Sequence, residues 1–349
     1  MELNKKIEGI LGLSAIGDAM GATTENLTFG QIREMFTAPV TTFQKPGKTA
    51  FALGNEAGEI TDDFSQIYML SKAILSNKGR ITRDIVIKAI LEWSDIPKYF
   101  NRFAGPTTRS AIEMYKNPGM EMKPLPGAVA VDYASKATNG AAMKIAPAGI
   151  LHPGNLEAAI DDAIVIAQVT HDNSLAISGA CAIAAATSAS LAEKATIEEV
   201  ISAGVYGAIR GETKAKSVSR VVAGASVVER IKLALQIAEG AGSKEEKLLK
   251  LSQIIGSGLH ISEAVPCAFG IAALNKDSAL QAVIDAVNIG YDTDTIATIV
   301  GTMVGAFVDF EDKNFLDLYD KVQKANEINL IILADELATA CLLYTSPSP

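Results

Sequence analysis

Alanine-rich segments in which apolar residues recur every three or four positions dominate this sequence. That spacing places apolar side chains on one face of a helix, because a helix turns once every ~3.6 residues. The clearest examples are residues 64–75, 156–169, 227–239 and 278–288. The sequence has no convincing period-two strands bounded by hairpin turns. It therefore predicts an all-α protein.

Two long stretches interrupt the helical pattern, at residues 37–60 and 117–155. Loops of this length inside a compact domain are more often functional than incidental. No linker rich in Ser or Gly divides the chain, so its 349 residues fit either one large domain or two tightly packed halves. A core of this size is large enough to contain a deep cleft.

The charge balance and the apolar runs exclude several classes of protein. A net charge of −9 argues against a protein that grips nucleic acid or anionic membrane through a basic face. Residues 173–192 carry no charge, but their Asn, Ser, Thr and Ala content favours a packed soluble helix over a membrane span. The start of the chain lacks the apolar core of a signal peptide. With three cysteines and no CxxC pair, we expect a cytoplasmic protein without a zinc framework.

Two acidic clusters stand directly before apolar helical segments. They consist of Thr61, Asp62 and Asp63 in one case, and of Asp292, Asp294 and Thr295 in the other. Each cluster alone fits a helix cap, because Asp and Thr side chains accept hydrogen bonds from the free N–H groups of a first turn. Together the clusters suggest two helix N-termini that converge and supply four carboxylates and two hydroxyls to one centre.

Four carboxylates in one cleft repel one another strongly unless cations lie between them. Two divalent cations would neutralise the formal charge of those four groups. Because the chain has only three histidines, the ligands would be oxygen atoms, which favour hard cations over zinc. The sequence thus predicts a dinuclear Mg²⁺ site, with Mn²⁺ also possible, that would orient a substrate and activate a water.

Six motifs occur in the order, and with roughly the spacing, found in the ADP-ribosylglycohydrolase family. They are GLSAIGDAMGATTE (12–25), TDD (61–63), TNGAAMKIAPAG (138–149), THDNSLAISGA (170–180), EAVPCAFG (263–270) and GYDTDTIATIVGTMVGA (290–306). The resemblance runs from about residue 5 to residue 335. Members of this family include the hydrolase that reactivates ADP-ribosylated dinitrogenase reductase. It implies an all-α, single, compact, mostly orthogonal multi-helix domain. Its two-magnesium cleft would cleave the bond between ADP-ribose and an acceptor.

The resemblance also implies roles for individual residues. The metal ligands would be Thr61, Asp62, Asp63, Asp292, Asp294 and Thr295. Glu25, which alone would be taken for a surface glutamate, or one of Asp62 and Asp63, would take a proton from the attacking water. Asn139 and Gly140 match positions near the distal ribose and phosphates, and His171 would lie on the adenosine side. We expect Asp18 instead to bond to a neighbouring helix terminus.

Three further residues are expected to affect which substrate fits the cleft, without changing the predicted metal ligands. Phe64 follows the TDD motif where Thr or Ser is common in the family, and Tyr291 stands where glycine is common. Lys136 lies in the loop expected near the phosphates, where it would add positive charge or simply be solvated.

We therefore expect a cytoplasmic, metal-dependent hydrolase of an ADP-ribosyl linkage, with an ADP-ribose-containing substrate such as an ADP-ribosylated protein. One alternative is a glycosidase of another nucleoside or nucleotide. The other is a non-catalytic nucleotide-binding or structural relative, against which the presence of all six ligands and Glu25 argues. The sequence leaves open the acceptor linkage (arginine, serine, nucleic acid or a small molecule) and the oligomeric state.

The last nine residues, CLLYTSPSP, differ from the charged, alanine-rich segment before them. They resemble the translation of a common sequencing adapter. We expect the ADP-ribosylglycohydrolase-like domain to span residues 1–340 and residues 341–349 to be a non-native tail.

Overall fold

The helices of the computed structural model account for most of the chain, and the residues described are 2–48, 50–124 and 126–345. The α-helices are α1 (Leu3–Gly21), α2 (Phe29–Met35), α3 (Asp62–Ser76), α4 (Arg83–Ser94), α5 (Pro97–Phe103), α6 (Pro106–Lys116), α7 (Gly140–Met143), α8 (Ala146–Ile150), α9 (Leu156–Thr170), α10 (Ser174–Ser190), α11 (Ile197–Val218), α12 (Val227–Glu239), α13 (Lys244–Lys250), α14 (Ile261–Leu274), α15 (Ala279–Val287), α16 (Thr293–Val304), α17 (Lys313–Asn326) and α18 (Leu330–Thr345). Three short helical turns are η1 (Ala134–Lys136), η2 (Leu251–Ile255) and η3 (Gly305–Phe307). The described residues contain isolated β-bridges but no strand, so the all-α prediction is confirmed.

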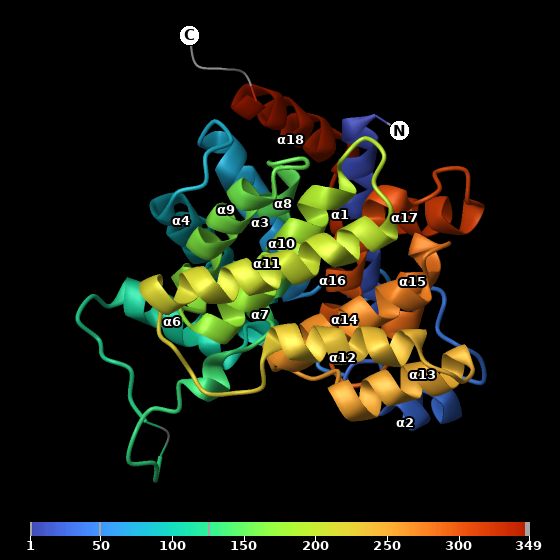
Figure 1. The fold of residues 1–349 in the computed structure, drawn as a ribbon, viewed down its shortest axis with the longest axis horizontal. Coiled ribbons are helices and arrows are strands. Elements are labelled where there is room, and N and C mark those ends of the chain that lie inside the picture. The colour runs from blue at the N-terminus through green and yellow to red at the C-terminus, as the bar shows by residue number, and fades with distance from the viewer. Residues whose placement is uncertain (1, 49, 125, 346–349) are drawn as a thin grey trace.

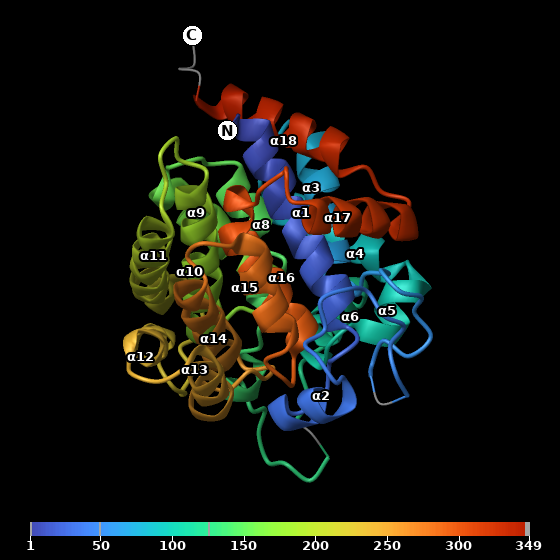
Figure 2. The ribbon, with the colours of Figure 1, turned by 90° about the vertical axis from the view of Figure 1, so that its right-hand side faces the viewer.

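Helix α1 runs through the middle of the molecule with α16 beside it (Figure 2). It is buried from Lys6 to Gly21. Small residues let the two backbones approach closely: a Cβ added to Gly301 would lie 2.5 Å from the carbonyl of Leu13, and one added to Gly21 would lie 2.5 Å from the Cα of Asp294. This contact sets the start of α16 against the end of α1.

The other helices surround this central pair in several directions. In Figure 1, α1 runs steeply while α11 and α12 run across the view, so the helices do not form a parallel bundle. Helix α10 is buried along nearly its whole length and packs between α9 and α11. It corresponds to the uncharged run at 173–192. Among the described residues, no helix is both long enough and apolar enough to cross a membrane. The result is one compact helical domain.

Helix boundaries follow the sequence pattern closely where the pattern spans several turns. Helices α3, α9, α12 and α15 begin and end within two residues of the segments predicted for them. The described part of 37–60 contains no helix, as expected. The prediction that 117–155 is non-helical was partly wrong, because η1, α7 and α8 lie within it. These elements have three to five residues each, which is too few for a helical period to show.

The predicted domain end at residue 340 falls inside α18, which continues to Thr345. The Cys341 side chain is buried, and its thiol lies 3.0 Å from the carbonyl oxygen of Ile150. Residues 346–349 lie outside the described residues, and the non-native origin of 341–349 stays a prediction.

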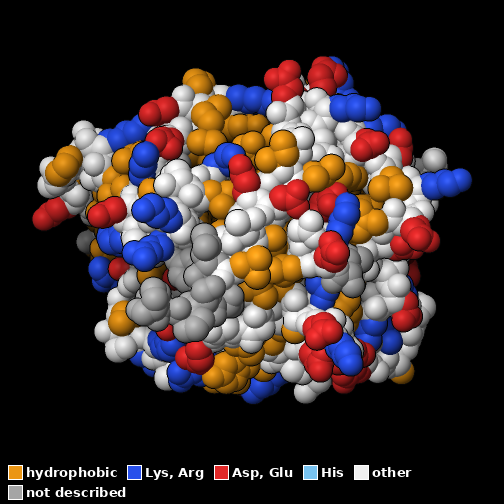
Figure 3. All heavy atoms as spheres, turned by 90° about the horizontal axis from the view of Figure 1, so that it is seen from above, with side chains coloured by type: hydrophobic (Ala, Val, Ile, Leu, Met, Phe, Trp, Pro, Cys, Tyr) orange, Lys and Arg blue, Asp and Glu red, His pale blue; other side chains and the backbone are white. Residues whose placement is uncertain are grey.

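On the face seen from above, acidic and basic side chains are interspersed among apolar ones (Figure 3).

Candidate active site

The two acidic clusters occupy the N-termini of α3 and α16, but their side chains do not serve as ordinary caps. Thr61 is the N-cap residue of α3 and Asp292 that of α16, and neither makes a side-chain cap hydrogen bond. Two backbone N–H groups at the start of α3 instead donate to Asp18 of α1, whose carboxylate accepts from Thr61 at 3.0 Å and from Phe64 at 2.8 Å. The predicted bond of Asp18 to a neighbouring helix terminus is confirmed.

Three segments of the chain bring their carboxylates together. Oxygen atoms of Asp18, Asp63 and Asp294 lie within 4.8 Å of one another, and so do oxygen atoms of Glu25, Asp292 and Asp294. The two groups share Asp294, so they are adjacent. Asp62 belongs to neither group, yet it lies close enough for Asp18 and Asp292 to raise its pKa. The structure thus gathers all four predicted acidic ligands and Glu25 in one region.

The cluster carries more negative charge than its surroundings balance. Burial, followed by repulsion from Asp292, Asp62 and Asp18, raises the pKa of Glu25 to about 9. Burial and Asp18 together raise the pKa of Asp62 to about 8. Two buried oxygens, Glu25 Oε2 and Asp63 Oδ1, have no hydrogen-bond partner among the described residues. Buried carboxylate oxygens without donors are the atoms that hard cations bind.

Both predicted threonines lie among these carboxylates. The hydroxyl oxygen of Thr61 is 2.7 Å from Asp18, 3.3 Å from Asp63 and 3.5 Å from Asp294. Thr295 is 4% exposed; burial raises the pKa values of Asp63 and Asp292, and the nearby Thr295 side chain partly opposes that rise. The set of donors, all carboxylate or hydroxyl oxygens, fits Mg²⁺ or Mn²⁺.

Asn139 and Gly140 lie directly beside the acidic cluster. The Asn139 amide donates to Asp292 Oδ2 at 2.5 Å, and its backbone N–H donates to the carbonyl of Leu259. Gly140 faces the ring of His171, because a Cβ there would lie 3.0 Å from the ring nitrogen Nε2. The loop is thus tied to the start of α16 on one side and to His171 on the other.

His171 is fully enclosed and not charged. Its two ring nitrogens pair with the hydroxyls of Thr138 at 2.8 Å and Thr170 at 2.7 Å. Burial, with help from Lys144 and Lys136, lowers its pKa well below the ordinary value. The neutral ring therefore packs against Gly140 and, through Thr138, helps to hold the Asn139–Gly140 turn in place.

Lys144 was not predicted from the sequence. It is 0% exposed, and its ammonium donates to the carbonyl of Gly140 at 2.5 Å. Burial lowers the pKa of Lys144 to about 7, against the opposing pull of Asp62 and Asp63. It is the charged residue of the otherwise apolar motif AAMKIAPAG, and that contrast was the one signal available.

A cleft of about 590 Å³ adjoins His171, and its lining includes Lys136, Asn173 and Arg220. Neither Lys136 nor Arg220 forms an ion pair with a described residue, and the Arg220 guanidinium lies 3.6 Å from the centroid of the Tyr133 ring. The cleft offers positive charge and an aromatic face. The expected position of Lys136 near the substrate phosphates stays a prediction.

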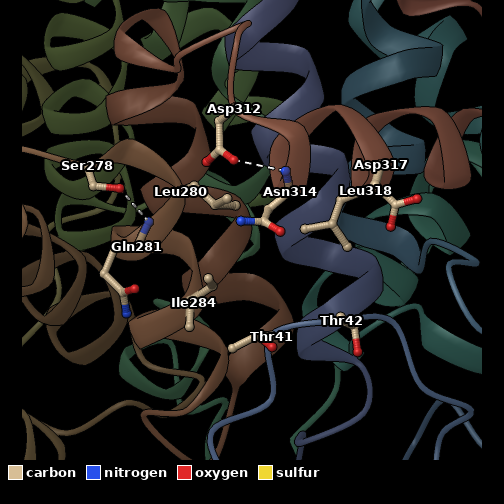
Figure 4. Close-up of a pocket in the computed structure, with 10 residues that line it drawn as sticks. All are labelled: Thr41, Thr42, Ser278, Leu280, Gln281, Ile284, Asp312, Asn314, Asp317 and Leu318. Carbon is tan, nitrogen blue, oxygen red and sulfur yellow. Dashed lines mark hydrogen bonds between the residues drawn. The ribbon is translucent and has the colours of Figure 1, made fainter.

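Other hollows also lie outside the cluster. Tyr291 and Asn26, both with positive φ, border a mainly apolar groove of about 830 Å³ between α2 and η2. A smaller pocket of about 350 Å³ lies between α15 and α17 (Figure 4). In it, Ser278 and Asp312 already cap helices by accepting from Gln281 and Asn314. This pocket shows no group of titratable residues like that at α16.

Comparison with known proteins agrees with the predicted resemblance. The family model described as ADP-ribosylglycohydrolase matches residues 1–344. An Escherichia coli (strain K12) protein named uncharacterized protein YegU is 30% identical over 306 residues, covering 86% of this chain and 88% of that protein. The ADP-ribosyl-[dinitrogen reductase] glycohydrolase of Rhodospirillum rubrum is 28% identical over 175 residues, 49% of this chain and 53% of that protein.

The fold has a solved counterpart. A structure titled ADP-ribosylglycohydrolase-related protein complex superimposes with a TM-score of 0.66 at 22% identity, and the match covers 97% of this chain and 99% of the other. This agreement extends over the whole helical domain.

Proposed function

Because this chain belongs to the ADP-ribosylglycohydrolase family and is therefore a glycohydrolase-type enzyme, we propose that it hydrolyses ADP-ribosyl glycosidic bonds with two divalent cations. The observation that carries the proposal is the pair of adjacent acidic groups that share Asp294. A family relative from Rhodospirillum rubrum bears the name of a glycohydrolase for ADP-ribosylated dinitrogen reductase. We extend that substrate class, an ADP-ribosyl group on a protein or smaller acceptor, to this chain.

We assign the cations to the oxygens of Thr61, Asp62, Asp63, Asp292, Asp294 and Thr295. The buried Asp63 Oδ1, which has no donor among the described residues, supports this assignment. So do the raised pKa values of Glu25 and Asp62, since added positive charge would relieve the repulsion that raises them. Bound Mg²⁺ or Mn²⁺ would polarise a water and hold ribose hydroxyls.

The chain's own residues then have separate tasks. Glu25, at the edge of the cluster, is placed to accept a proton from the attacking water once its pKa has fallen, with Asp62 or Asp63 as the other candidates. Ionised carboxylates near the anomeric carbon stabilise the positive charge that develops there. Asn139 holds the carboxylate of Asp292 by its 2.5 Å hydrogen bond and so fixes one wall of the site.

We place the nucleotide half of the substrate in the cleft beside His171. Lys136 and Arg220 supply positive charge there for phosphates, and Tyr133 and Arg220 present flat faces on which a base can stack. Gly140 lies next to His171, and its lack of a Cβ lets the His171 ring pack against the turn that bonds to the acidic cluster through Asn139.

The test is a panel of ADP-ribosylated arginine, ADP-ribosylated serine, ADP-ribosylated nucleic acid and free nucleosides, assayed with and without a chelator. We expect turnover of at least one ADP-ribosylated substrate, its loss on chelation, and a fall of more than ~100-fold in Asp292→Ala, beyond what loss of an outer partner of a metal ligand costs. Asp285→Asn, a buried carboxylate in neither acidic group, is the matched control and should stay active.

Each alternative has its own outcome in this panel. Full activity in metal-stripped protein would refute the metal-dependent mechanism. Turnover of free nucleosides alone would indicate a glycosidase of another substrate class. Binding of ADP-ribose without turnover of any substrate, under any metal condition, would indicate a non-catalytic nucleotide-binding protein.

A further inference from the structure

Asp18 is the one carboxylate of the acidic region that comes from the interior of α1, and it is 0% exposed. Its Oδ1 accepts from the Thr61 backbone at 3.0 Å and from the Thr61 hydroxyl at 2.7 Å. Its Oδ2 accepts from the backbones of Thr61 at 3.0 Å and Phe64 at 2.8 Å. Both oxygens are therefore already engaged by donors from the start of α3.

The Thr61 hydroxyl has a single proton and three acceptors within reach. The 2.7 Å contact to Asp18 is shorter than the 3.3 Å contact to Asp63 and the 3.5 Å contact to Asp294. The proton therefore lies toward Asp18. The oxygen lone pairs are then left facing the carboxylates of Asp63 and Asp294, an arrangement that is repulsive unless a cation lies between these oxygens.

Asp18 could itself be read as a ligand, because its oxygens lie within 4.8 Å of those of Asp63 and Asp294. Two observations argue against that reading. The Asp18 oxygens already accept from three donor groups, whereas Asp63 Oδ1 accepts from none among the described residues. Outer partners of metal ligands characteristically fix the proton position and the orientation of the ligand they bond.

We propose that Asp18 is a positioning residue that draws the hydroxyl proton of Thr61 away from the cluster, so that the Thr61 oxygen can bind a cation. This inference rests on the metal site proposed above. It assigns Asp18 to the support of the site and Thr61 to the site itself. It also explains why α1 carries a fully buried carboxylate.

The experiment is a double-mutant cycle read out as cation affinity, without substrate. Isothermal titration with Mg²⁺ and with Mn²⁺ gives the Kd of the wild type, Asp18→Asn, Thr61→Val and the double variant. The Asn amide has the shape of the Asp carboxylate but is uncharged and has one acceptor oxygen instead of two, so it draws the proton of the Thr61 hydroxyl less strongly. We expect Asp18→Asn to bind about 10–100-fold more weakly, and the double variant to bind about as weakly as Thr61→Val alone.

Full retention of the Asp18→Asn effect in the Thr61→Val background would overturn the proposal, because a direct ligand or a purely electrostatic contribution acts independently of Thr61. Unchanged affinity in Asp18→Asn would overturn it as well. A wild type that binds neither cation would contradict the metal site itself, and so separates failure of the proposed function from failure of this inference.

Two further variants control for folding and charge. Asp285→Asn removes a buried carboxylate that is hydrogen-bonded by Asn275 and Gln281, and it should bind cations as the wild type does. Asp18→Glu keeps the charge but moves the acceptor oxygens by one methylene, and it serves if Asp18→Asn does not give a cooperative thermal melt. If Asp18 acts by orienting the proton of the Thr61 hydroxyl, Asp18→Glu should raise the Kd for the cation, and this effect should again depend on Thr61. An unchanged Kd would indicate that the charge of residue 18 alone matters and would refute the proposal.

Discussion

Gly301→Ala tests whether the contact between α1 and α16 sets the geometry of the acidic cluster. A Cβ at Gly301 would lie 2.5 Å from the carbonyl carbon and oxygen of Leu13, and 2.7 Å from the backbone nitrogen of Ser14. Ordinary van der Waals contact begins at 3.4 Å. Because all three atoms belong to the backbone of a buried helix, no side chain can turn aside, and α1 and α16 must separate by about 1 Å.

The expected cost follows from two opposing effects. Alanine is favoured over glycine in a helix interior by about 1 kcal/mol, while overpacking of a buried contact costs about 1–3 kcal/mol. With backbone on both sides we take the upper end, which leaves a net loss of about 2 kcal/mol. Gly301 is about 10 Å along α16 from Asp294, so the separation also shifts that carboxylate. Misplacement of about 1 Å can lower activity about 100-fold.

Urea unfolding measures the stability change, and titration with Mn²⁺ measures the displacement of the cluster. Gly30→Ala is the matched control, because a Cβ at Gly30 of α2 meets nothing within 4 Å, so its stability should stay equal or rise. If Gly301→Ala is as stable as Gly30→Ala and binds Mn²⁺ as the wild type does, the close helix contact does not hold the site, and the reasoning is refuted.

Three other outcomes are expected. Burial and repulsion from neighbouring carboxylates raise the pKa of Glu25 to about 9 and of Asp62 to about 8. The folded state therefore binds these protons more tightly than the unfolded state, and the metal-free protein should lose stability as the pH rises from about 4 to about 9. Thermal melts should show this slope and its reduction by Mg²⁺, whereas a melt independent of pH would contradict it. Asn139→Ala removes a hydrogen bond that lowers the pKa of Asp292, so the acid limb of the pH–rate profile should move to higher pH, and an unmoved limb would count against this role. Lys144→Met removes the donor to the Gly140 carbonyl and should raise KM about tenfold with a small change in Tm, whereas an unchanged KM would make the contact incidental.

The long helices could be predicted because their signal is local. Residues 156–169 repeat apolar side chains over four turns, and α9 spans Leu156–Thr170. The short helices could not: α7 and α8 have four and five residues, about one turn each, and a single turn has no period. Pro147 near the start of α8 fixes a φ that suits a helix. Proline is also common in loops, so Pro147 did not distinguish a short helix from the non-helical segment predicted there.

The carboxylates of the acidic region could be predicted from the sequence, but the contacts that position them could be predicted only in part. Like charges at two helix N-termini require a common counter-charge, so the sequence alone predicts that Asp62 and Asp292 lie close together. Lys144 was missed because its role depends on where the Gly140 carbonyl and the α3 carboxylates lie, none of which a spacing in the chain encodes. The bond of Asp18 to α3 was anticipated, but the direction in which Thr61 points its proton was not.

The central position of α1 has a consequence for how the protein is made. Helix α1 leaves the ribosome before its close partner α16, which begins about 270 residues later in the chain. At about 5–20 residues per second, α1 waits roughly 15 to 55 s for that partner. During this time an apolar helix must be kept from wrong associations, and its contacts, so distant in sequence, form slowly. The carboxylates of α1 and α16 meet only when this docking is complete, so a growing chain has no competent site before α16 has been synthesised.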